Sequence, residues 1–147
     1  MYRAIATSLA ILATAGLAWA HSGVKNPTVK ARMDLMMQIG EATGSIVKMA
    51  KGELPFDAAA AQRAQQVLIE ASGRISVAFE ANETDPKSEA LPVIWQDWAQ
   101  FVAKSEAMAA AAASMQLDTL GNLRSSVPAL GKSCGGCHEA FRKPSDN

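Results

Sequence analysis

The sequence lacks the features that build a β-sheet protein or a disulfide-stapled one. No run alternates apolar and polar residues with β-branched side chains, and aromatic residues make up only 5% of the 147 residues. The two cysteines stand three residues apart, so a disulfide between them would close a very small loop and stabilise little. Because 14 basic residues balance 14 acidic ones, charge gives no reason to expect nucleic acid as a partner. The length fits one domain.

The N-terminal segment has the three parts of a secretory signal. Arg3 precedes an apolar run over residues 4–18, and the pattern Ala-Trp-Ala follows at residues 18–20. A single membrane anchor is the alternative, but the run is short for a span of about 20 residues. We therefore predict a signal peptide over residues 1–20 and a mature domain over residues 21–147, located in the periplasm and not attached to a membrane after cleavage.

Apolar residues recur at spacings of three and four through the rest of the chain, which favours helices. Start and stop residues divide this pattern into helices over residues 27–51, 58–79, 92–115 and 118–141, with a loop over residues 82–89. Four amphipathic helices joined mostly by short loops predict an all-α, antiparallel up-down-up-down four-helix bundle. An irregular helical fold is the alternative. Pro128 predicts a kink or a late start in the last helix.

The first helix has an apolar side that we expect to face the bundle core. Its members are Val29, Met33, Met36, Met37, Gly40, Gly44 and Val47.

The C-terminal sequence Cys134-Gly135-Gly136-Cys137-His138 has the spacing of a haem c attachment motif. Two thiols one helical turn apart can reach the two vinyl groups on one edge of a porphyrin and form thioethers. The adjacent His138 then offers an imidazole nitrogen to the iron, and the glycines leave room for the macrocycle. The sequence thus predicts one covalent haem c, with its iron, enclosed by the helical bundle.

Other uses of this motif fit the chain less well. A thioredoxin-like redox pair requires a βαβ setting, which the helical pattern excludes. A structural zinc site requires about four ligands and would have to recruit the distant His21. A helical binding protein with an incidental motif is the third possibility.

The second axial position of the iron decides between two functions. If a side chain occupies this position, the protein is an electron carrier. If the position is open, the iron can bind small gases. Candidates to close it are Met33, Met36, Met37 and Met49 on the first helix and His21 at the mature N-terminus. Methionines at helical spacing are more often core residues than ligands, so spacing alone does not choose among them.

A Cys-x-x-Cys-His motif on the last of four helices resembles the class II c-type cytochromes, the cytochrome c-prime family. The resemblance covers essentially the whole mature chain. The matching segments are Lys30 to Gly52, Glu53-Leu54-Pro55-Phe56-Asp57, Pro92-Val93-Ile94-Trp95 with Phe101, and Cys134 to Lys143.

This resemblance implies roles for individual residues. Met36 occupies the position that holds the iron-bound methionine in the low-spin members, so it becomes the favoured axial ligand beside His138. Arg32 matches an arginine beside the haem propionates, and Phe79 matches an aromatic residue that packs on the haem. Arg142 matches an arginine near the proximal histidine.

The resemblance and the motif together predict a non-enzymatic electron carrier with a six-coordinate, low-spin haem. Its partners would be redox proteins of unidentified kind, and the chain itself would be a monomer or a homodimer. The alternative is a five-coordinate cytochrome c-prime that binds nitric oxide or carbon monoxide, with Met36 only lining an apolar pocket.

Removal of both attachment thiols tests how far folding depends on the haem. We expect the Cys134→Ala, Cys137→Ala double variant to unfold with a broad, weakly cooperative transition, because the porphyrin supplies apolar surface that a small-residue bundle lacks. Circular dichroism during heating, with the haem-loaded protein as control, measures this. A double variant that unfolds as cooperatively as the control contradicts the prediction.

Overall fold

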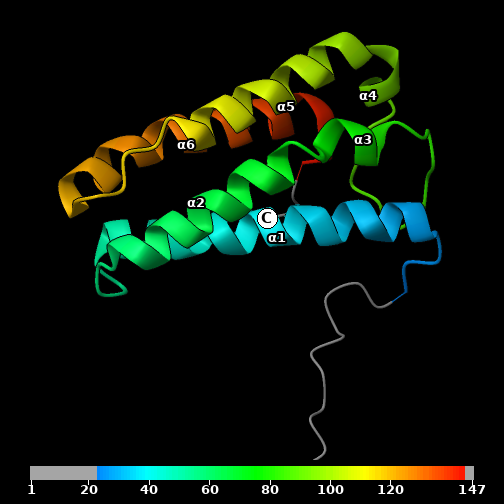
Figure 1. The fold of residues 1–147 in the computed structure, drawn as a ribbon. Coiled ribbons are helices and arrows are strands. Elements are labelled where there is room, and N and C mark those ends of the chain that lie inside the picture. Colours follow the sequence, from blue (N-terminus) through cyan, green and yellow to red (C-terminus); the bar gives the residue numbers. More distant parts are fainter. Residues whose placement is uncertain (1–22, 145–147) are drawn as a thin grey trace, which may run out of the picture.

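The computed structural model describes residues 23–144 and contains six helices within that range (Figure 1). They are α1 (Pro27–Lys51), α2 (Ala58–Ser72), α3 (Ile75–Phe79), α4 (Val93–Gln96), α5 (Trp98–Ala113) and α6 (Leu120–Phe141). The predicted signal peptide, its cleavage site and His21 lie outside the described residues. Within the described residues, no helix is long and apolar enough to cross a membrane.

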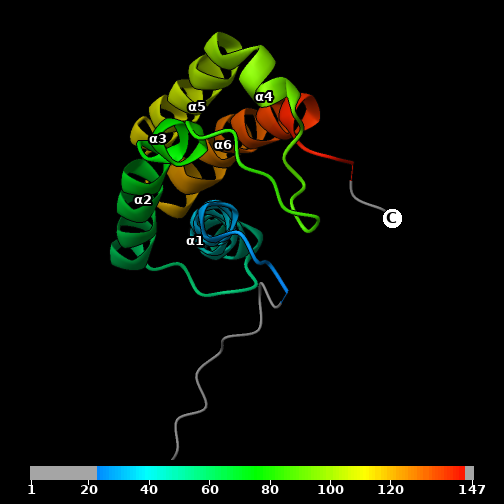
Figure 2. The same ribbon diagram turned by 90° about the vertical axis from the view of Figure 1, so that its right-hand side faces the viewer.

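The four long helices form an antiparallel bundle. Contacts join α1 to α2, α2 to α5, α5 to α6, and α6 back to α1. Successive long helices run in opposite directions in Figure 1, and Figure 2 shows α2, α5 and α6 arranged around one side of α1. The predicted all-α, up-down-up-down four-helix bundle is therefore confirmed.

Side-chain oxygen atoms cap the starts of the four long helices, and the caps of α1 and α2 are the ones that the sequence indicates. Each accepts a hydrogen bond from a main-chain N–H in the first turn, and the capping residues are Asn26, Asp57, Asp97 and Thr119. At the end of α1, Gly52 adopts a left-handed conformation with φ of 80°, and its N–H donates to the carbonyls of Lys48 and Met49. These signals fix where the long helices begin and where α1 turns back.

Two of the predicted helices are broken, which corrects their expected continuity. The helix expected over residues 58–79 divides at Gly73 and Arg74, where glycine is a poor helix former and the Arg74 N–H bonds Ala71 three residues back. The helix expected from residue 92 breaks at Asp97, which has a non-helical φ of −122° and ψ of 56°. Asp97 breaks the helix because its carboxylate caps α5 by accepting from Gln100 N–H.

Of the kink or late start predicted for the last helix, the late start does not occur. Helix α6 begins at Leu120 and continues through Pro128. Pro128 and Arg124 are both exposed, so water can reach the Arg124 carbonyl that lacks its usual N–H donor. The proline is therefore tolerated inside the helix.

The buried side of α1 differs from the predicted one. The residues that pack into the protein core are Val29, Leu35, Ile39, Ala42, Ile46 and Met49, together with Arg32. Most of the side predicted to face the core instead borders a cavity, described below. Helix α1 thus has two apolar sides with different neighbours, and periodicity alone could not tell them apart.

Residues 80–91 form a long connection between α3 and α4, which we call the strap. The Asp85 carboxylate accepts hydrogen bonds from the main-chain N–H groups of Lys25 (2.8 Å), Asn26 (3.0 Å) and Lys87 (2.8 Å). Glu83 accepts from the Asn26 side chain at 2.8 Å. One part of the strap is therefore tied to the start of α1.

Asp85 makes the stability of this attachment dependent on pH. Hydrogen bonds from Lys87, Asn26 and Lys25 lower the pKa of Asp85 from its ordinary value of 3.8. A carboxylate with a lowered pKa stabilises the folded state above its unfolded-state pKa, and this contribution is lost as the pH falls through the folded-state value. The Asp85→Asn variant should thus be less stable than the parent at pH 7, with the difference shrinking below about pH 4.

Urea unfolding at pH 7 and pH 3 measures this difference. The Glu80→Gln variant is the control, because Glu80 is an exposed strap residue that does not bond the start of α1. An Asp85→Asn defect that is equally large at both pH values would contradict the assignment.

Candidate cofactor site

One cavity of about 670 Å³ lies among α1, α5, α6 and the strap. Its volume is within the usual range of small-molecule and cofactor sites, about 300–1,000 Å³. All the site residues predicted from the sequence line it, namely Arg32, Met36, Phe79, Cys134, Cys137, His138 and Arg142. The fold therefore brings residues from both ends of the chain to one space.

Helix α6 supplies the two thiols. Cys134 and Cys137 are half-buried and unpaired, one helical turn apart on the side of α6 that faces the cavity. Burial raises the pKa of both thiols, and the Lys104 ammonium partly opposes this at Cys137. Lys104 belongs to α5 and reaches across to α6, since its Nζ would lie 3.8 Å from a Cβ added at Gly136.

His138 lies at the same end of α6. Its side chain borders the open cavity and is exposed, but the surrounding protein partly desolvates the imidazole. This partial burial lowers the pKa of the imidazole, and the Arg142 guanidinium lowers it further, while Glu89 acts in the opposite direction. A lowered pKa favours the neutral imidazole, which is the form that ligates a metal.

Helix α1 forms the opposite wall, where the candidate methionines are now separated. Met33, Met36 and Met37 line the cavity, whereas Met49 is 3% exposed within the protein core and does not. Met108 of α5 also lines the cavity. Helical spacing alone could not show that the side of α5 carrying Met108 would face a cavity.

Arg32 is 2% exposed and its guanidinium is held by main-chain carbonyls. Its Nε donates to Ala78 at 2.9 Å, its Nη1 to Glu83 at 2.8 Å, and its Nη2 to Ala81. The guanidinium carbon also lies 5.1 Å from the centre of the Phe79 ring and 5.2 Å from that of Trp95. Burial lowers the pKa of Arg32, with Glu83 opposing. Sequence analysis did not identify this contact with the strap.

Phe79 is 7% exposed and belongs to an aromatic cluster along one side of the cavity. Its ring centre lies 5.2 Å from that of Phe101, which in turn lies 5.3 Å from Phe141. The Phe79 carbonyl accepts a hydrogen bond from the Trp95 indole at 2.8 Å. These contacts fix the position of Phe79 without any cofactor, so a role in packing on a haem stays a prediction.

The lining suits a large, flat, mainly apolar group attached at α6. The Thr43 hydroxyl of α1 borders the cavity and is buried without a hydrogen-bond partner among the described residues. No group of three or more histidine, cysteine, aspartate or glutamate residues in residues 23–144 forms a metal site of its own. The zinc alternative, which would recruit His21, falls outside the described residues.

A family model for cytochrome c' matches residues 27–142. The chain belongs to the cytochrome c' family. This match begins after the predicted signal peptide and covers all six helices of the described residues. It includes every predicted site residue.

Several known proteins resemble this cytochrome. A cytochrome c-556 of Agrobacterium tumefaciens (strain B2A) is 33% identical over 118 residues, covering 78% of this chain and 95% of its own. The solved structure of cytochrome c' from Rhodopseudomonas palustris is 30% identical, with a TM-score of 0.77, covering 83% and 100%. A nitric oxide complex of an Alcaligenes xylosoxidans cytochrome c prime mutant is also 30% identical, with a TM-score of 0.70, covering 80% and 94%.

Membership in this family makes the protein a c-type cytochrome with covalent haem c and its iron. Cys134 and Cys137 are the only cysteines in the sequence, so they are the residues available for attachment. The cavity that both thiols border has the size and the apolar lining that this cofactor requires.

The buried Arg32 contacts predict a sharp distinction between arginine and lysine at this position. The Arg32→Lys variant keeps the charge but loses the planar fork that reaches three carbonyls, and it should destabilise the fold by about 3 kcal/mol. The midpoint of urea unfolding measures the loss.

The matched control for this substitution is Arg63→Lys. Arg63 is exposed on α2, and its replacement should change stability by less than about 0.5 kcal/mol. Equal effects of the two substitutions would show that the Arg32 contacts do not stabilise the strap.

Proposed function

We propose that this cytochrome c' family member is a periplasmic electron carrier, with the iron of its haem c ligated by His138 and Met36. The observation that carries the proposal is that His138 on α6 and Met36 on α1 line the same cavity as both attachment thiols. The resemblance to the cytochrome c-556 of Agrobacterium tumefaciens supports the same assignment.

Haem c supplies a one-electron redox couple when it is bound. Thioethers from Cys134 and Cys137 would hold the group against α6, and His138 would offer its imidazole nitrogen from the next position along the helix. The Met36 thioether from α1 would exclude water from the iron and favour the reduced state. The apolar walls from α1 and α5 keep solvent away from the metal.

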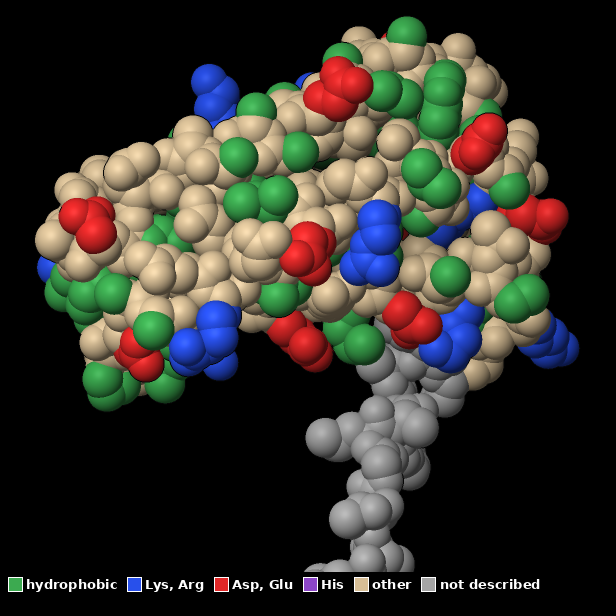
Figure 3. Space-filling view, viewed as in Figure 1, with side chains coloured by type: hydrophobic (Ala, Val, Ile, Leu, Met, Phe, Trp, Pro, Cys, Tyr) green, Lys and Arg blue, Asp and Glu red, His purple; other side chains and the backbone are tan. Residues whose placement is uncertain are grey.

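The cellular setting follows from the predicted export signal. Residues 1–20 direct the chain across the inner membrane in this proposal, and haem attachment takes place in the periplasm. The protein passes electrons between other redox proteins rather than converting a substrate itself. Acidic and basic side chains are interspersed on the face in Figure 3, which offers no large surface of one sign for nucleic acid.

The second candidate function is binding of nitric oxide or carbon monoxide at a five-coordinate iron. The specific observation in its favour is the resemblance to the cytochrome c prime of Alcaligenes xylosoxidans, whose mutant was solved as a nitric oxide complex. In that case Met36 lines the wall without bonding the iron.

Optical spectra of the oxidised, reduced and carbon monoxide-treated reduced protein separate these functions. Ligation by Met36 predicts a low-spin spectrum with sharp reduced bands and little response to carbon monoxide. In the Met36→Ala variant the iron should become high-spin and bind the gas. Met33→Ala, Met37→Ala and Met108→Ala are matched controls, because these side chains line the same cavity.

Each result assigns the iron's second axial position. A parent protein that is high-spin and responds to carbon monoxide replaces the electron-carrier proposal with gas binding. A change confined to Met33→Ala, Met37→Ala or Met108→Ala keeps the electron carrier and moves the ligand to that residue.

A further inference from the structure

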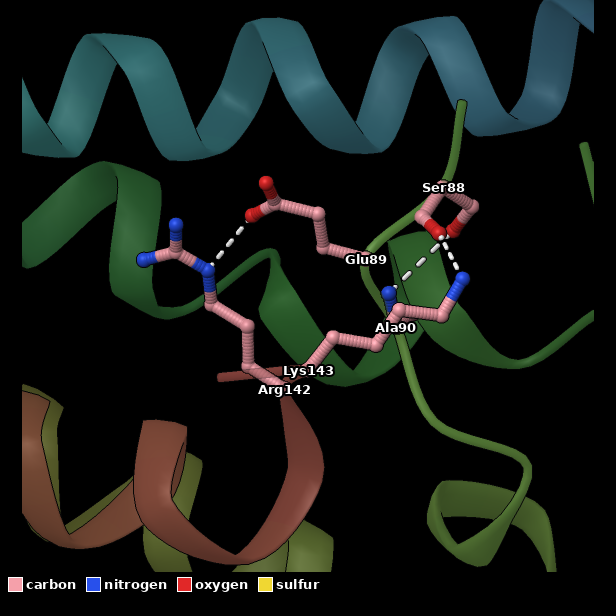
Figure 4. A network of polar contacts seen from close by, with 5 residues as sticks. All are labelled: Ser88, Glu89, Ala90, Arg142 and Lys143. Carbon is pink, nitrogen blue, oxygen red and sulfur yellow. Dashed lines mark hydrogen bonds and ion pairs between the residues drawn. The ribbon is translucent and has the colours of Figure 1, made fainter. Parts of the chain in front are cut away.

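The strap is joined to the end of α6 by main-chain hydrogen bonds. Leu91 N–H donates to the Phe141 carbonyl at 2.9 Å, and Lys143 N–H donates to the Glu89 carbonyl at 2.8 Å. Between them Ala90 and Arg142 form an isolated antiparallel bridge. The Lys143 ammonium also donates to the Ser88 carbonyl at 2.9 Å (Figure 4). The strap is therefore fixed in register against the residues that follow His138.

This register brings the Glu89 side chain to Arg142. A Glu89 carboxylate oxygen accepts from Arg142 Nε at 2.6 Å, and both residues line the cavity. The main-chain N–H of Arg142 donates to the His138 carbonyl at 3.0 Å, which ties the same residue to the histidine. Figure 4 shows this contact between the Glu89 carboxylate and Nε of the guanidinium.

The contact between Glu89 and Arg142 affects the electrostatics of the cavity more than the stability of the fold. The side chains of Arg142 and Glu89 are 43% and 56% exposed, and an ion pair this exposed contributes little to folding. Both charges nevertheless border the space where the haem is held, and the energy of a charge at a redox centre falls with its distance. The direction in which Arg142 is held therefore matters to the cofactor.

We propose that Glu89 is a positioning residue, which holds the Arg142 guanidinium at the cavity edge and thereby keeps its positive charge close to the haem. The inference rests on the proposed haem attachment at Cys134 and Cys137 but not on ligation by Met36. It predicts that Glu89 acts on the reduction potential in two opposite ways. Its own negative charge lowers the potential, and its hold on Arg142 raises it.

Two substitutions of Glu89 separate these effects in the full, haem-loaded protein. Glu89→Gln and Glu89→Ala remove the same charge, but only glutamine keeps an oxygen that can accept from Arg142 Nε. The potential of Glu89→Gln should lie above the parent's. The potential of Glu89→Ala should lie below that of Glu89→Gln, by roughly a threefold change in the ratio of reduced to oxidised protein, or about 28 mV for one electron.

The same pair of substitutions in an Arg142→Gln background tests whether the effect passes through the arginine. The difference between alanine and glutamine at position 89 should vanish there. Glu139→Gln is the matched charge control, because Glu139 is exposed beside His138 on α6 and does not line the cavity. It should raise the potential equally in both backgrounds. Equal potentials for Glu89→Ala and Glu89→Gln, or a difference that persists without Arg142, would overturn the proposal.

A variant on the other side of the contact keeps the test decisive if Glu89→Ala does not retain haem. Arg142→Lys preserves the charge and lacks the planar fork, so its potential should fall below the parent's. An unchanged potential would refute the positioning role. Acid–organic extraction reports haem attachment, and the optical spectrum reports Met36 ligation. Failure of either part of the proposed function is therefore seen separately from failure of this inference.

Discussion

The cavity among α1, α5 and α6 is the constraint on which the rest of the structure depends. A space of about 670 Å³ remains among the side chains that line it, and unfilled apolar volume destabilises a fold in proportion to its size. The bundle therefore relies on a group that is bonded to α6 and packs against α1. Small and flexible residues line these walls and leave room for that group.

Polar contacts hold the open edge of this cavity in position. Arg32 fastens the beginning of the strap through two of its carbonyls and also binds the Ala78 carbonyl of α3. Asp85 ties the middle of the strap to the start of α1, and Arg142 and Lys143 bind its end. Each contact joins segments far apart in the sequence. Main-chain groups of the strap thus find hydrogen-bond partners without a sheet, and the end of α6 that carries His138 is held against the strap.

One side of helix α1 packs into the core, and another side lines the cavity. Leu35, Ala42 and Ile46 pack into the core, while Met33 and Met36 face the cavity. A change on the cavity side can therefore alter the iron's surroundings with little effect on the bundle.

The sequence by itself determined the helical class, most helix starts and the attachment motif. These features depend on neighbouring residues, such as the cap at Asn26 and the one-turn spacing of Cys134 and Cys137. Tertiary structure alone decided that Met49 lies in the core and Met108 at the cavity, and that Arg32 binds the strap. Those outcomes depend on which helix packs against each apolar side. A repeat of about 3.6 residues indicates that one side of a helix is apolar, but it does not indicate what packs against that side.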